Sequence, residues 1–196
     1  MRNSLPSHRL PVGRLALALV LLALVLLSAC RASGPGTPAR TVTAFFAKYR
    51  DRPGFRTTEW SADILQRLAL VRMGNLLGGS DLTKAITGIR TARVLSFTPT
   101  TGSAQNLVRE GLSGEVSGLL QAERYTSLAL QNSGAATYQY VVKANGDQVS
   151  ELVATGALPD ALGSFVLVQV QGSFTRAQAE ALSRVLPEVV QQTAGK

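Results

Sequence analysis

The order of the predicted secondary structure elements indicates an α+β protein built on a largely antiparallel sheet. Helical and strand patterns alternate in the first part of the chain, and four strand patterns then follow one another before a last helix. Consecutive strands pair antiparallel through short turns, and helices that are set apart in the chain pack against such a sheet as a separate layer. We therefore predict a two-layer sandwich, with a mostly antiparallel sheet of about six strands and the helices on one face.

Four segments before residue 124 are predicted to be helices, mainly because their apolar residues recur at helical spacing. These segments are residues 41–50, 61–73, 81–87 and 103–123. The last of them contains Gly111, Gly114 and Gly118, each of which costs a helix about 1 kcal/mol relative to alanine. We therefore expect a helix here, with a break near Ser113 and Gly114 as the alternative.

Strands are predicted where β-branched and aromatic residues are enriched between turn residues. The predicted strands are residues 55–60, 90–98, 125–130, 137–144, 148–155 and 164–171. Asn145-Gly146-Asp147 lies between two of them and is a hairpin turn signal. The run from Phe165 to Val170 is almost continuously apolar, which is typical of a central strand.

A last helix is predicted after Thr175, which forms a capping-box pattern with Gln178. Apolar residues then recur from Leu182 to Val189 at i, i+3, i+4 and i+7, as they do on one face of a helix. Pro187 lies inside this pattern, where a proline removes a backbone hydrogen bond and favours a kink.

The N-terminal segment has the layout of a secretory signal peptide. Arg2, Arg9 and Arg14 form a basic region, and an uncharged apolar run follows from Leu15 to Leu27. As a helix this run is roughly 20 Å long, whereas the core of a bilayer is about 30 Å thick and needs roughly 20 apolar residues. A permanent membrane span is therefore not expected, and the basic end should stay on the cytoplasmic side.

The sequence Leu27-Ser28-Ala29-Cys30 resembles the lipobox of bacterial lipoproteins, which has an aliphatic residue, two small residues and a cysteine. The resemblance implies that Cys30 receives a diacylglyceryl group and becomes the first residue after cleavage. The alternatives are an ordinary signal peptide with an incidental cysteine, or a buried thiol in a core helix. Arg31 stands where an inner-membrane retention signal usually has Asp, which favours the outer membrane if the cell has one.

We accordingly divide the chain into three parts. They are a lipoprotein signal peptide (1–29), the lipidated Cys30 with a flexible tether (30–40), and a single α+β domain (41–196). The tether is rich in glycine and proline and has no packing face. Fully extended, the residues after Cys30 reach about 33–36 Å, so the domain stays close to the membrane that holds the lipid.

The composition excludes several kinds of site. The formal net charge is +8, and loss of the three signal-peptide arginines lowers it to +5, which does not by itself indicate nucleic acid binding. Aromatic residues are not interleaved with basic ones, as they are in proteins that bind single strands. Because His8 and Cys30 are the only residues of their types, the domain lacks a His-based triad, a Cys nucleophile and a Cys/His zinc site. We predict no metal site, no cofactor and no nucleic acid partner.

Several segments of the domain resemble a family known as domain of unknown function 4252. The segments that carry the resemblance are Tyr49 to Ser61, Arg93 to Phe97, Tyr138 to Val142, Asp147 to Val153 and Phe165 to Thr175. The resemblance covers about residues 45–190, and residues 103–123 fit the pattern less well because of their glycines. It implies a small secreted or lipid-anchored envelope protein with this order of strands and helices, and it implies no activity.

Four basic residues lie just after the tether, namely Lys48, Arg50, Arg52 and Arg56. Basic residues near a charged membrane surface contribute about 1 kcal/mol each, so this cluster is a candidate contact for anionic headgroups or an acidic partner. The alternative is a basic turn that is simply solvated.

A set of acidic residues could supply a pair of catalytic carboxylates, which glycoside hydrolysis requires about 5–10 Å apart. The set is Glu59, Asp63, Glu110, Glu115 and Glu123. Asp63 is equally explained as a charge at a helix start, and Glu110 and Glu115 as exposed helix positions. Trp60 could stack on a sugar, but a single Trp at a strand end is also a common core residue.

These observations favour a non-catalytic binding module that is exported and lipid-anchored to the bacterial cell envelope. Its expected partners are the membrane, through the anchor, and an envelope protein or another surface partner. The alternatives are a carboxylate-dependent hydrolase of envelope glycans, and a carrier of a small ligand or lipid that would need an apolar cavity of several hundred cubic ångströms.

Overall fold

The computed structural model describes residues 37–60, 80–99, 105–129, 138–158 and 160–194. The chain separates into two units, Met1–Thr37 and Pro38–Lys196, and the described elements all belong to the second unit. The predicted signal peptide and the helix predicted at 61–73 lie outside the described residues.

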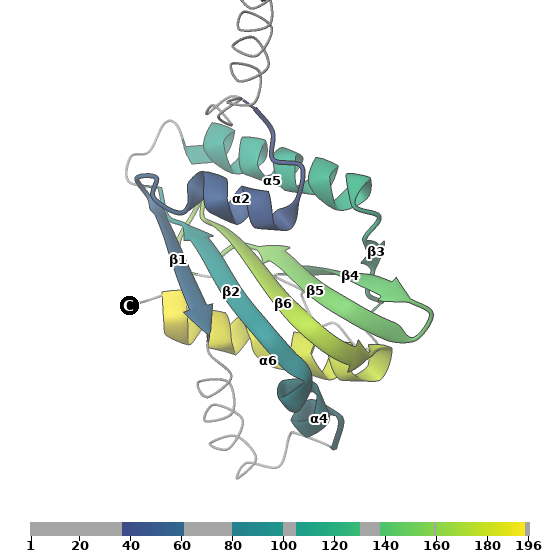
Figure 1. Cartoon of the computed structure of the whole chain (residues 1–196). Coiled ribbons are helices and arrows are strands. Elements are labelled where there is room, and N and C mark those ends of the chain that lie inside the picture. Colours follow the sequence, from purple (N-terminus) through teal and green to yellow (C-terminus); the bar gives the residue numbers. More distant parts are fainter. Residues whose placement is uncertain (1–36, 61–79, 100–104, 130–137, 159, 195–196) are drawn as a thin grey trace, which may run out of the picture. The chain divides into compact units, whose positions relative to one another are not determined.

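The second unit is organised around one sheet of six strands, shown in Figure 1. The strands are β1 (Phe55–Trp60), β2 (Ile89–Phe97), β3 (Thr126–Ser127), β4 (Tyr138–Asn145), β5 (Gln148–Gly156) and β6 (Phe165–Thr175). Their order in the sheet is β1-β2-β6-β5-β4-β3, and every neighbouring pair is antiparallel. The predicted α+β class and the antiparallel sheet of about six strands are therefore confirmed, although the strand predicted at 125–130 pairs only at Thr126 and Ser127.

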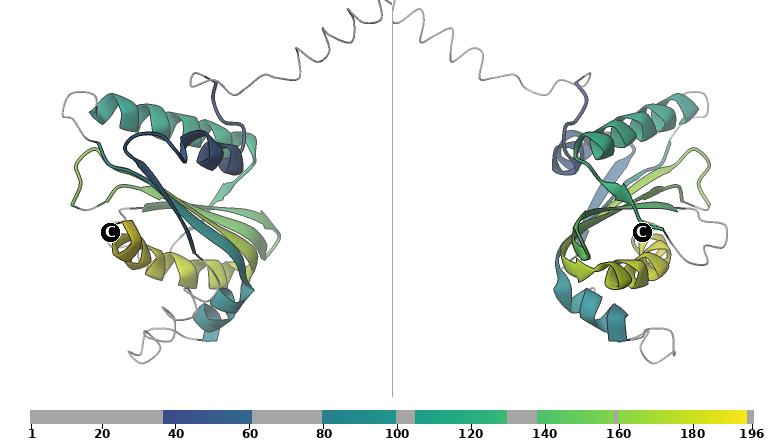
Figure 2. Two further views of the ribbon diagram at one scale, coloured as in Figure 1. Left: turned by 60° about the vertical axis from the view of Figure 1, so that its left-hand side comes forward. Right: turned by 90° about the vertical axis from the view of Figure 1, so that its right-hand side faces the viewer.

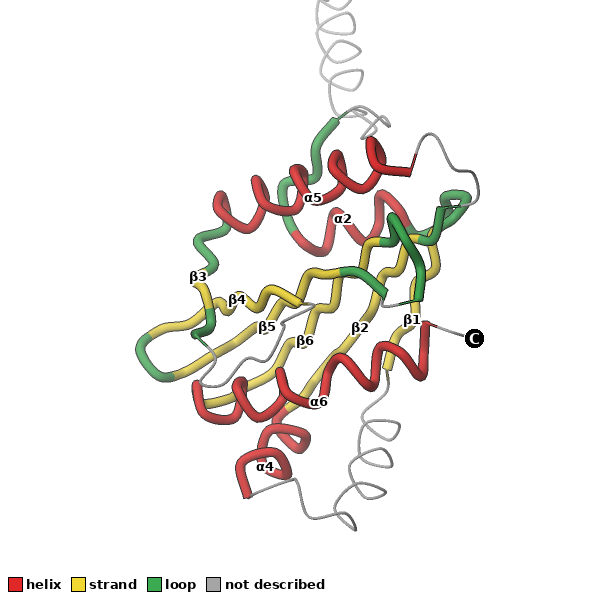
Figure 3. Tube along the Cα trace, turned by 180° about the vertical axis from the view of Figure 1, so that it is seen from behind, coloured by secondary structure: helices red, strands yellow, loops and turns green. Residues whose placement is uncertain are grey.

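The described helices cover both faces of the sheet, which corrects the prediction of helices on one face (Figures 1 and 2). These helices are α2 (Val42–Tyr49), α4 (Ser80–Gly88), α5 (Gln105–Ala122) and α6 (Arg176–Ala194). Helices α2 and α5 lie over one face, and α4 and α6 lie over the other, as Figure 3 also shows from behind. The result is three layers rather than two.

The side chains of β6 explain why both faces need a cover. Phe165 and Leu167 point into the core under α2 and α5, whereas Val166 and Val168 point into the core on the α4 and α6 side. All four side chains are fully or almost fully buried. Because successive strand residues face opposite sides, a continuous apolar run must be buried on both. The run predicted as a central strand therefore also required the second helical layer.

Local signals in the sequence are reproduced at the atomic level. The Thr175 N–H donates to Gln178 Oε1 at 2.9 Å, and the Gln178 N–H donates to Thr175 Oγ1 at 3.3 Å, which completes the predicted capping box of α6. Gly146 has a φ of +61° in the turn between β4 and β5, which confirms the predicted hairpin. Pro187 lies inside α6.

Helix α5 runs without a break from Gln105 to Ala122, so the alternative of a break near Gly114 is not observed. Gly111, Gly114 and Gly118 lie on its exposed side, and a Cβ added at any of them would meet nothing within 4 Å. Its buried side is formed by Leu112, Val116 and Leu119. Packing against the sheet therefore maintains a helix that its glycines weaken.

We expect each single substitution of Gly111, Gly114 or Gly118 by alanine to stabilise the protein. Alanine lowers the conformational entropy of the unfolded chain and fits the open space, so the free energy of unfolding should rise by about 0.5–1 kcal/mol per site. Denaturant-induced unfolding followed by circular dichroism measures this change. A decrease in stability at any of the three sites would contradict the placement of that glycine on a solvated helix face.

Candidate binding groove

A groove with a volume of about 680 Å³ opens at the end of the sheet near the β4–β5 hairpin. Thr91, Gln171, Glu151 and Lys143 lie next to one another across β2, β6, β5 and β4 and form part of its lining. They share the sheet face that α2 and α5 cover elsewhere, since Arg93, two residues from Thr91, contacts α2. In Figures 1 and 3 the hairpin extends past the ends of both helices.

Irregularities in three neighbouring strand pairs coincide at this groove. The β2–β6, β4–β5 and β5–β6 registers all shift at the same level of the sheet. As a result, Arg90 on β2, Ser150 on β5 and Ser173 on β6 have no partner in these registers, and all three are exposed and line the groove. Bulges of this kind bend a strand and redirect side chains, and they are common beside functional sites.

Two glycines permit the tight packing behind the bulges. A Cβ added at Gly172 would collide with the carbonyl oxygen of Gly88 and with the ring of Phe174. A Cβ added at Gly88, the last residue of α4, would come within 2.5 Å of the Ser173 carbonyl oxygen. The end of α4 is thus in direct contact with the bulged part of β6, and this contact has no room for side chains.

A buried polar network lies beside the groove. Arg93 Nε donates to Gln169 Oε1 at 2.6 Å, and Gln169 Nε2 donates in turn to Glu151 Oε1. Gln171 Nε2 approaches the other carboxylate oxygen of Glu151 at 3.4 Å. Gln169 is 2% exposed and Glu151 is 8% exposed, so their polar atoms depend on these hydrogen bonds. The network fixes the direction in which each amide and carboxylate points.

The surroundings of the network shift the pKa values of Tyr125 and Arg93 in opposite directions. Burial and a hydrogen bond to Glu151 raise the pKa of Tyr125, so its hydroxyl remains protonated and can donate to that carboxylate. Burial lowers the pKa of Arg93, while the negative charges of Glu59 and Glu151 oppose this effect. The Arg93 guanidinium also lies 4.7 Å from the centre of the Phe46 ring and donates to Thr43 Oγ1 at 2.8 Å. Phe46 and Thr43, which both lie on α2, therefore help to orient the Arg93 side chain.

Basic side chains lie at two sides of the groove. Arg90 is exposed on β2, and Lys143 on β4 lies 3.4 Å from Glu123 and 5.5 Å from the centre of the Tyr125 ring. Within the lining, Glu151 is the one acidic residue, and both of its oxygens already accept hydrogen bonds. The groove thus offers the exposed Arg90, a Lys143 that it shares with Glu123, and a carboxylate that is held by hydrogen bonds from uncharged amides.

A second groove, of about 510 Å³, lies between α5 and the other end of β4 and β5. Val116, Leu120 and Val141 contribute apolar surface to it, and Ser113 and Ser117 contribute hydroxyl groups. Its lining is therefore mixed rather than apolar. Because the carrier hypothesis requires an enclosed apolar cavity, this groove gives that hypothesis little support.

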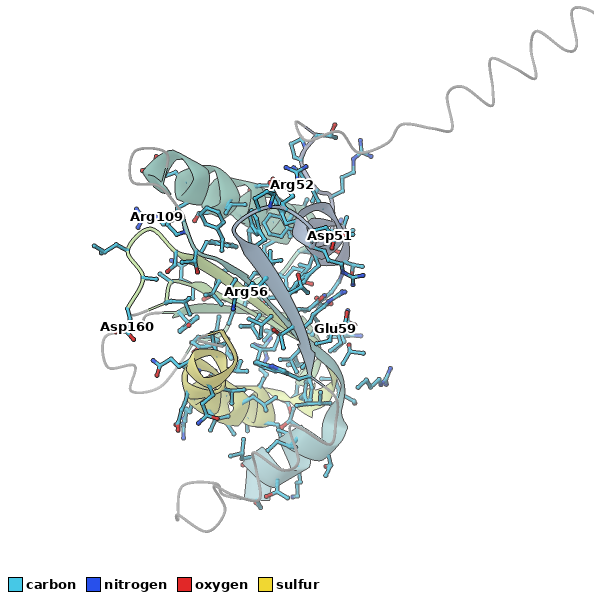
Figure 4. All side chains as sticks on the ribbon, turned by 90° about the vertical axis from the view of Figure 1, so that its left-hand side faces the viewer. Asp51, Arg52, Arg56, Glu59, Arg109 and Asp160 are labelled. Carbon is cyan, nitrogen blue, oxygen red and sulfur yellow. The ribbon has the colours of Figure 1, made fainter. Side chains whose placement is uncertain are left out.

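The structure gives the four residues of the predicted basic cluster different surroundings. Lys48 lies in a buried ion pair, with its Nζ 2.8 Å from Glu115 Oε1, and its side chain is only 6% exposed. Arg50 lies 3.3 Å from Glu59, and Arg52 lies 5.1 Å from the centre of the Tyr49 ring. Arg56 is exposed on β1. Figure 4 shows Asp51 and Glu59 among the arginines of this region, so the surface carries mixed charge.

The described members of the predicted acidic set differ in their surroundings. Glu115 accepts from Lys48, from the Tyr49 hydroxyl at 2.7 Å and from the Ala39 N–H at 2.5 Å. Glu123 accepts from the Val42 N–H at 3.1 Å and from Lys143. Glu59 pairs with Arg50, Glu110 is exposed on α5, and Asp63 lies outside the described residues. This arrangement gives no support to a shared pair of catalytic carboxylates. Trp60 is buried in the core, which agrees with the alternative that it is a core residue rather than a platform for a sugar.

The residues of the predicted lipid site, Leu27 to Cys30, lie outside the described residues. Among the described helices, none combines the length and apolar character that crossing a membrane requires. The described ranges also contain no group of three or more His, Cys, Asp or Glu residues that could hold a metal ion.

Sequence reasoning did not identify the groove. The sequence carries one weak signal of the groove, which is that polar residues interrupt two largely apolar strands. They are Gln169 and Gln171 in one strand and Glu151 in the other. These interruptions could have marked a polar site. The bulges that bring Arg90, Ser150 and Ser173 to it depend on pairing between segments far apart in the chain.

The fold and the groove define a three-layer α+β domain with one open antiparallel sheet and a polar site at one end of it. The chain belongs to the family described as Domain of unknown function (DUF4252), whose model matches residues 49–182. The match spans all six strands and the whole groove lining, and it confirms the family that the strand and turn segments indicated. No curated protein and no solved structure matches the chain significantly.

Proposed function

We propose that this protein is exported, anchored in the cell envelope by lipid on Cys30, and binds an envelope component in the polar groove without transforming it. The observation that carries the proposal is the hydrogen-bonded network beside an open groove. Burying Gln169 and Glu151 is costly unless their polar atoms are paired, and an apolar sheet face would avoid that cost. Such a network favours recognition of a ligand, because it holds the side chains of an open groove in a fixed orientation.

The start of the domain supports the anchoring part of the proposal. Two carboxylates on or just after α5 accept hydrogen bonds from the backbone where the predicted tether ends, Glu115 from Ala39 and Glu123 from Val42. The domain is therefore held firmly from Ala39 onward. An anchor at Cys30 would leave only a short segment between lipid and domain, whose extended length is about 3.3–3.6 Å per residue.

The proposal is tested by capture from native envelopes with three forms of the full chain. We expect the wild type to fractionate with membranes and to crosslink to one enriched envelope component. Cys30→Ser should lose the membrane association, and Ser173→Trp should remain in the membrane but lose the component, because the indole fills the groove. Arg184→Glu, an exposed change on α6, is the matched control.

Two results would contradict the proposal. If Cys30→Ser stays in the membrane fraction after a high-salt wash, the protein is not held by lipid on that residue. If Ser173→Trp captures the same component as Arg184→Glu, the groove is not the binding site. Chemical change of the captured component by wild-type protein would show catalysis instead of binding.

A further inference from the structure

We propose that the groove recognises an acidic oligosaccharide, that is, a chain of sugars that carries carboxylate or phosphate groups. This inference rests on the proposed function and adds the chemical class of the ligand. It follows from three features of the lining: many small hydrogen-bonding groups, few apolar side chains, and a formal charge of +1 from Arg90, Lys143 and Glu151.

The first feature is the density of amide and hydroxyl groups. Six side chains of the lining carry one or the other, namely Thr91, Asn145, Gln148, Ser150, Gln171 and Ser173. Hydroxyls and amides can each donate and accept. Thr91 already donates to Gln171 Oε1 at 3.0 Å, and Ser150 donates to the Lys143 carbonyl oxygen at 3.1 Å, but both hydroxyl oxygens can still accept. Together with the other amides and Ser173 they can match the hydroxyl groups of a sugar, which also donate and accept. A site built to pair with hydroxyl groups discriminates strongly against ligands that lack them.

The second feature is the lack of an apolar anchor point. Ala144 and Val149 are the apolar residues of the lining, and both pack against the core on the opposite face of the sheet. Protein partners usually bind through a central aromatic or aliphatic side chain that fills a pocket. Bases of single-stranded nucleic acids need aromatic platforms, and no aromatic residue lines this groove. A polar, non-planar ligand fits the lining better than either.

The third feature is charge. Arg90 and Lys143 lie at different strands of the groove, and Glu151 is turned toward Gln169, Gln171 and Tyr125. A ligand in the groove therefore meets Arg90, a Lys143 that also pairs with Glu123, and a carboxylate that is turned toward internal donors, so the lining keeps a formal charge of +1. Charge complementarity favours an anion. The volume of about 680 Å³ lies within the 300–1,000 Å³ typical of sites for small ligands.

The test is titration calorimetry on the full chain in detergent micelles, with three probes. They are a hexamer of galacturonic acid, a neutral glucose hexamer of the same length and a hexaglutamate peptide. We expect the acidic sugar to bind at least tenfold more tightly than either other probe, and its affinity to fall with salt. Arg90→Glu should weaken its binding at least tenfold, and Ser173→Trp should abolish it, while Arg184→Glu should change it less than twofold.

Each other outcome would overturn the inference. Stronger binding of the peptide would indicate that the ligand is an acidic protein segment. Equal affinity for the two hexasaccharides would show that charge does not contribute to recognition. Equal weakening by Arg90→Glu and Arg184→Glu would show a general charge effect outside the groove. If no probe binds but the native capture still depends on Ser173, the proposed function stands and the ligand class is wrong.

Discussion

Alanine at Gly172 should be among the most destabilising single substitutions in this domain. The added methyl group would collide with the carbonyl oxygen of Gly88 and with the Phe174 ring, and the backbone atom cannot rotate away. Separating α4 from β6 to relieve the collision exposes core side chains, so we expect the free energy of unfolding to fall by about 2–3 kcal/mol. Denaturant-induced unfolding in the Cys30→Ser background measures the loss.

Gly114→Ala is the matched control for this prediction, since it makes the same chemical change in open space and should be slightly stabilising. The two variants together separate the effect of the collision from the general effect of replacing glycine on the unfolded chain. A loss of less than about 1 kcal/mol for Gly172→Ala would mean that α4 and β6 can move apart cheaply, against the close packing described above.

The Lys48–Glu115 pair carries the second large prediction. Removal of one partner of a buried ion pair leaves the other charge uncompensated and costs about 3–5 kcal/mol, and this pair is 6% and 11% exposed. We expect Lys48→Met to cost about 3 kcal/mol. The double variant Lys48→Met/Glu115→Leu should recover part of this loss, because it removes the orphaned carboxylate but also the acceptor of the Ala39 and Tyr49 donors. A double variant as unstable as the single one would show that packing, not charge, is what Lys48 supplies.

The same pair predicts the response to acid. Burial tends to raise the pKa of Glu115, but hydrogen bonds from Lys48, Ala39 and Tyr49 outweigh it and hold that pKa below its ordinary value. A carboxyl group with a lowered folded-state pKa adds stability that is fully present above the unfolded value of about 4.3 and is lost as the pH falls through the folded value. The free energy of unfolding of the wild type should therefore decline below about pH 4.3 more steeply than that of Glu115→Gln.

Much of the fold was predictable because its signals are local. The capping box of Thr175, the hairpin at Gly146 and the apolar faces of the helices each depend on residues within a few positions of one another. The second helical layer was missed although the apolar run from Phe165 to Val170 required it. Such a run shows that both faces of a strand are buried, but not which helices cover them.

The candidate site was less predictable because distant pairings build it. From the sequence, Lys48 is predicted to be part of a basic surface. In the structure it is buried against Glu115, because α2 packs on α5. The sequence does not distinguish the groove residues Arg90, Ser150 and Ser173 from other polar residues. They line one groove because three strand registers shift at the same level of the sheet. Neither the packing of α2 on α5 nor the shift of the strand registers produces a recognisable pattern within one segment of the sequence.

The hydrogen bonds that the Ala39 and Val42 N–H groups donate to Glu115 and Glu123 have a mechanical consequence. Tension that reaches the domain along the N-terminal chain enters at Ala39, where it meets a carboxylate that Lys48 and Tyr49 also hold. The load is then shared between α2, which continues the chain, and α5, on or just after which Glu115 and Glu123 accept the two hydrogen bonds. Both helices belong to the layer that covers one face of the sheet, so this layer is the first part of the domain to resist a pull on its N-terminal chain.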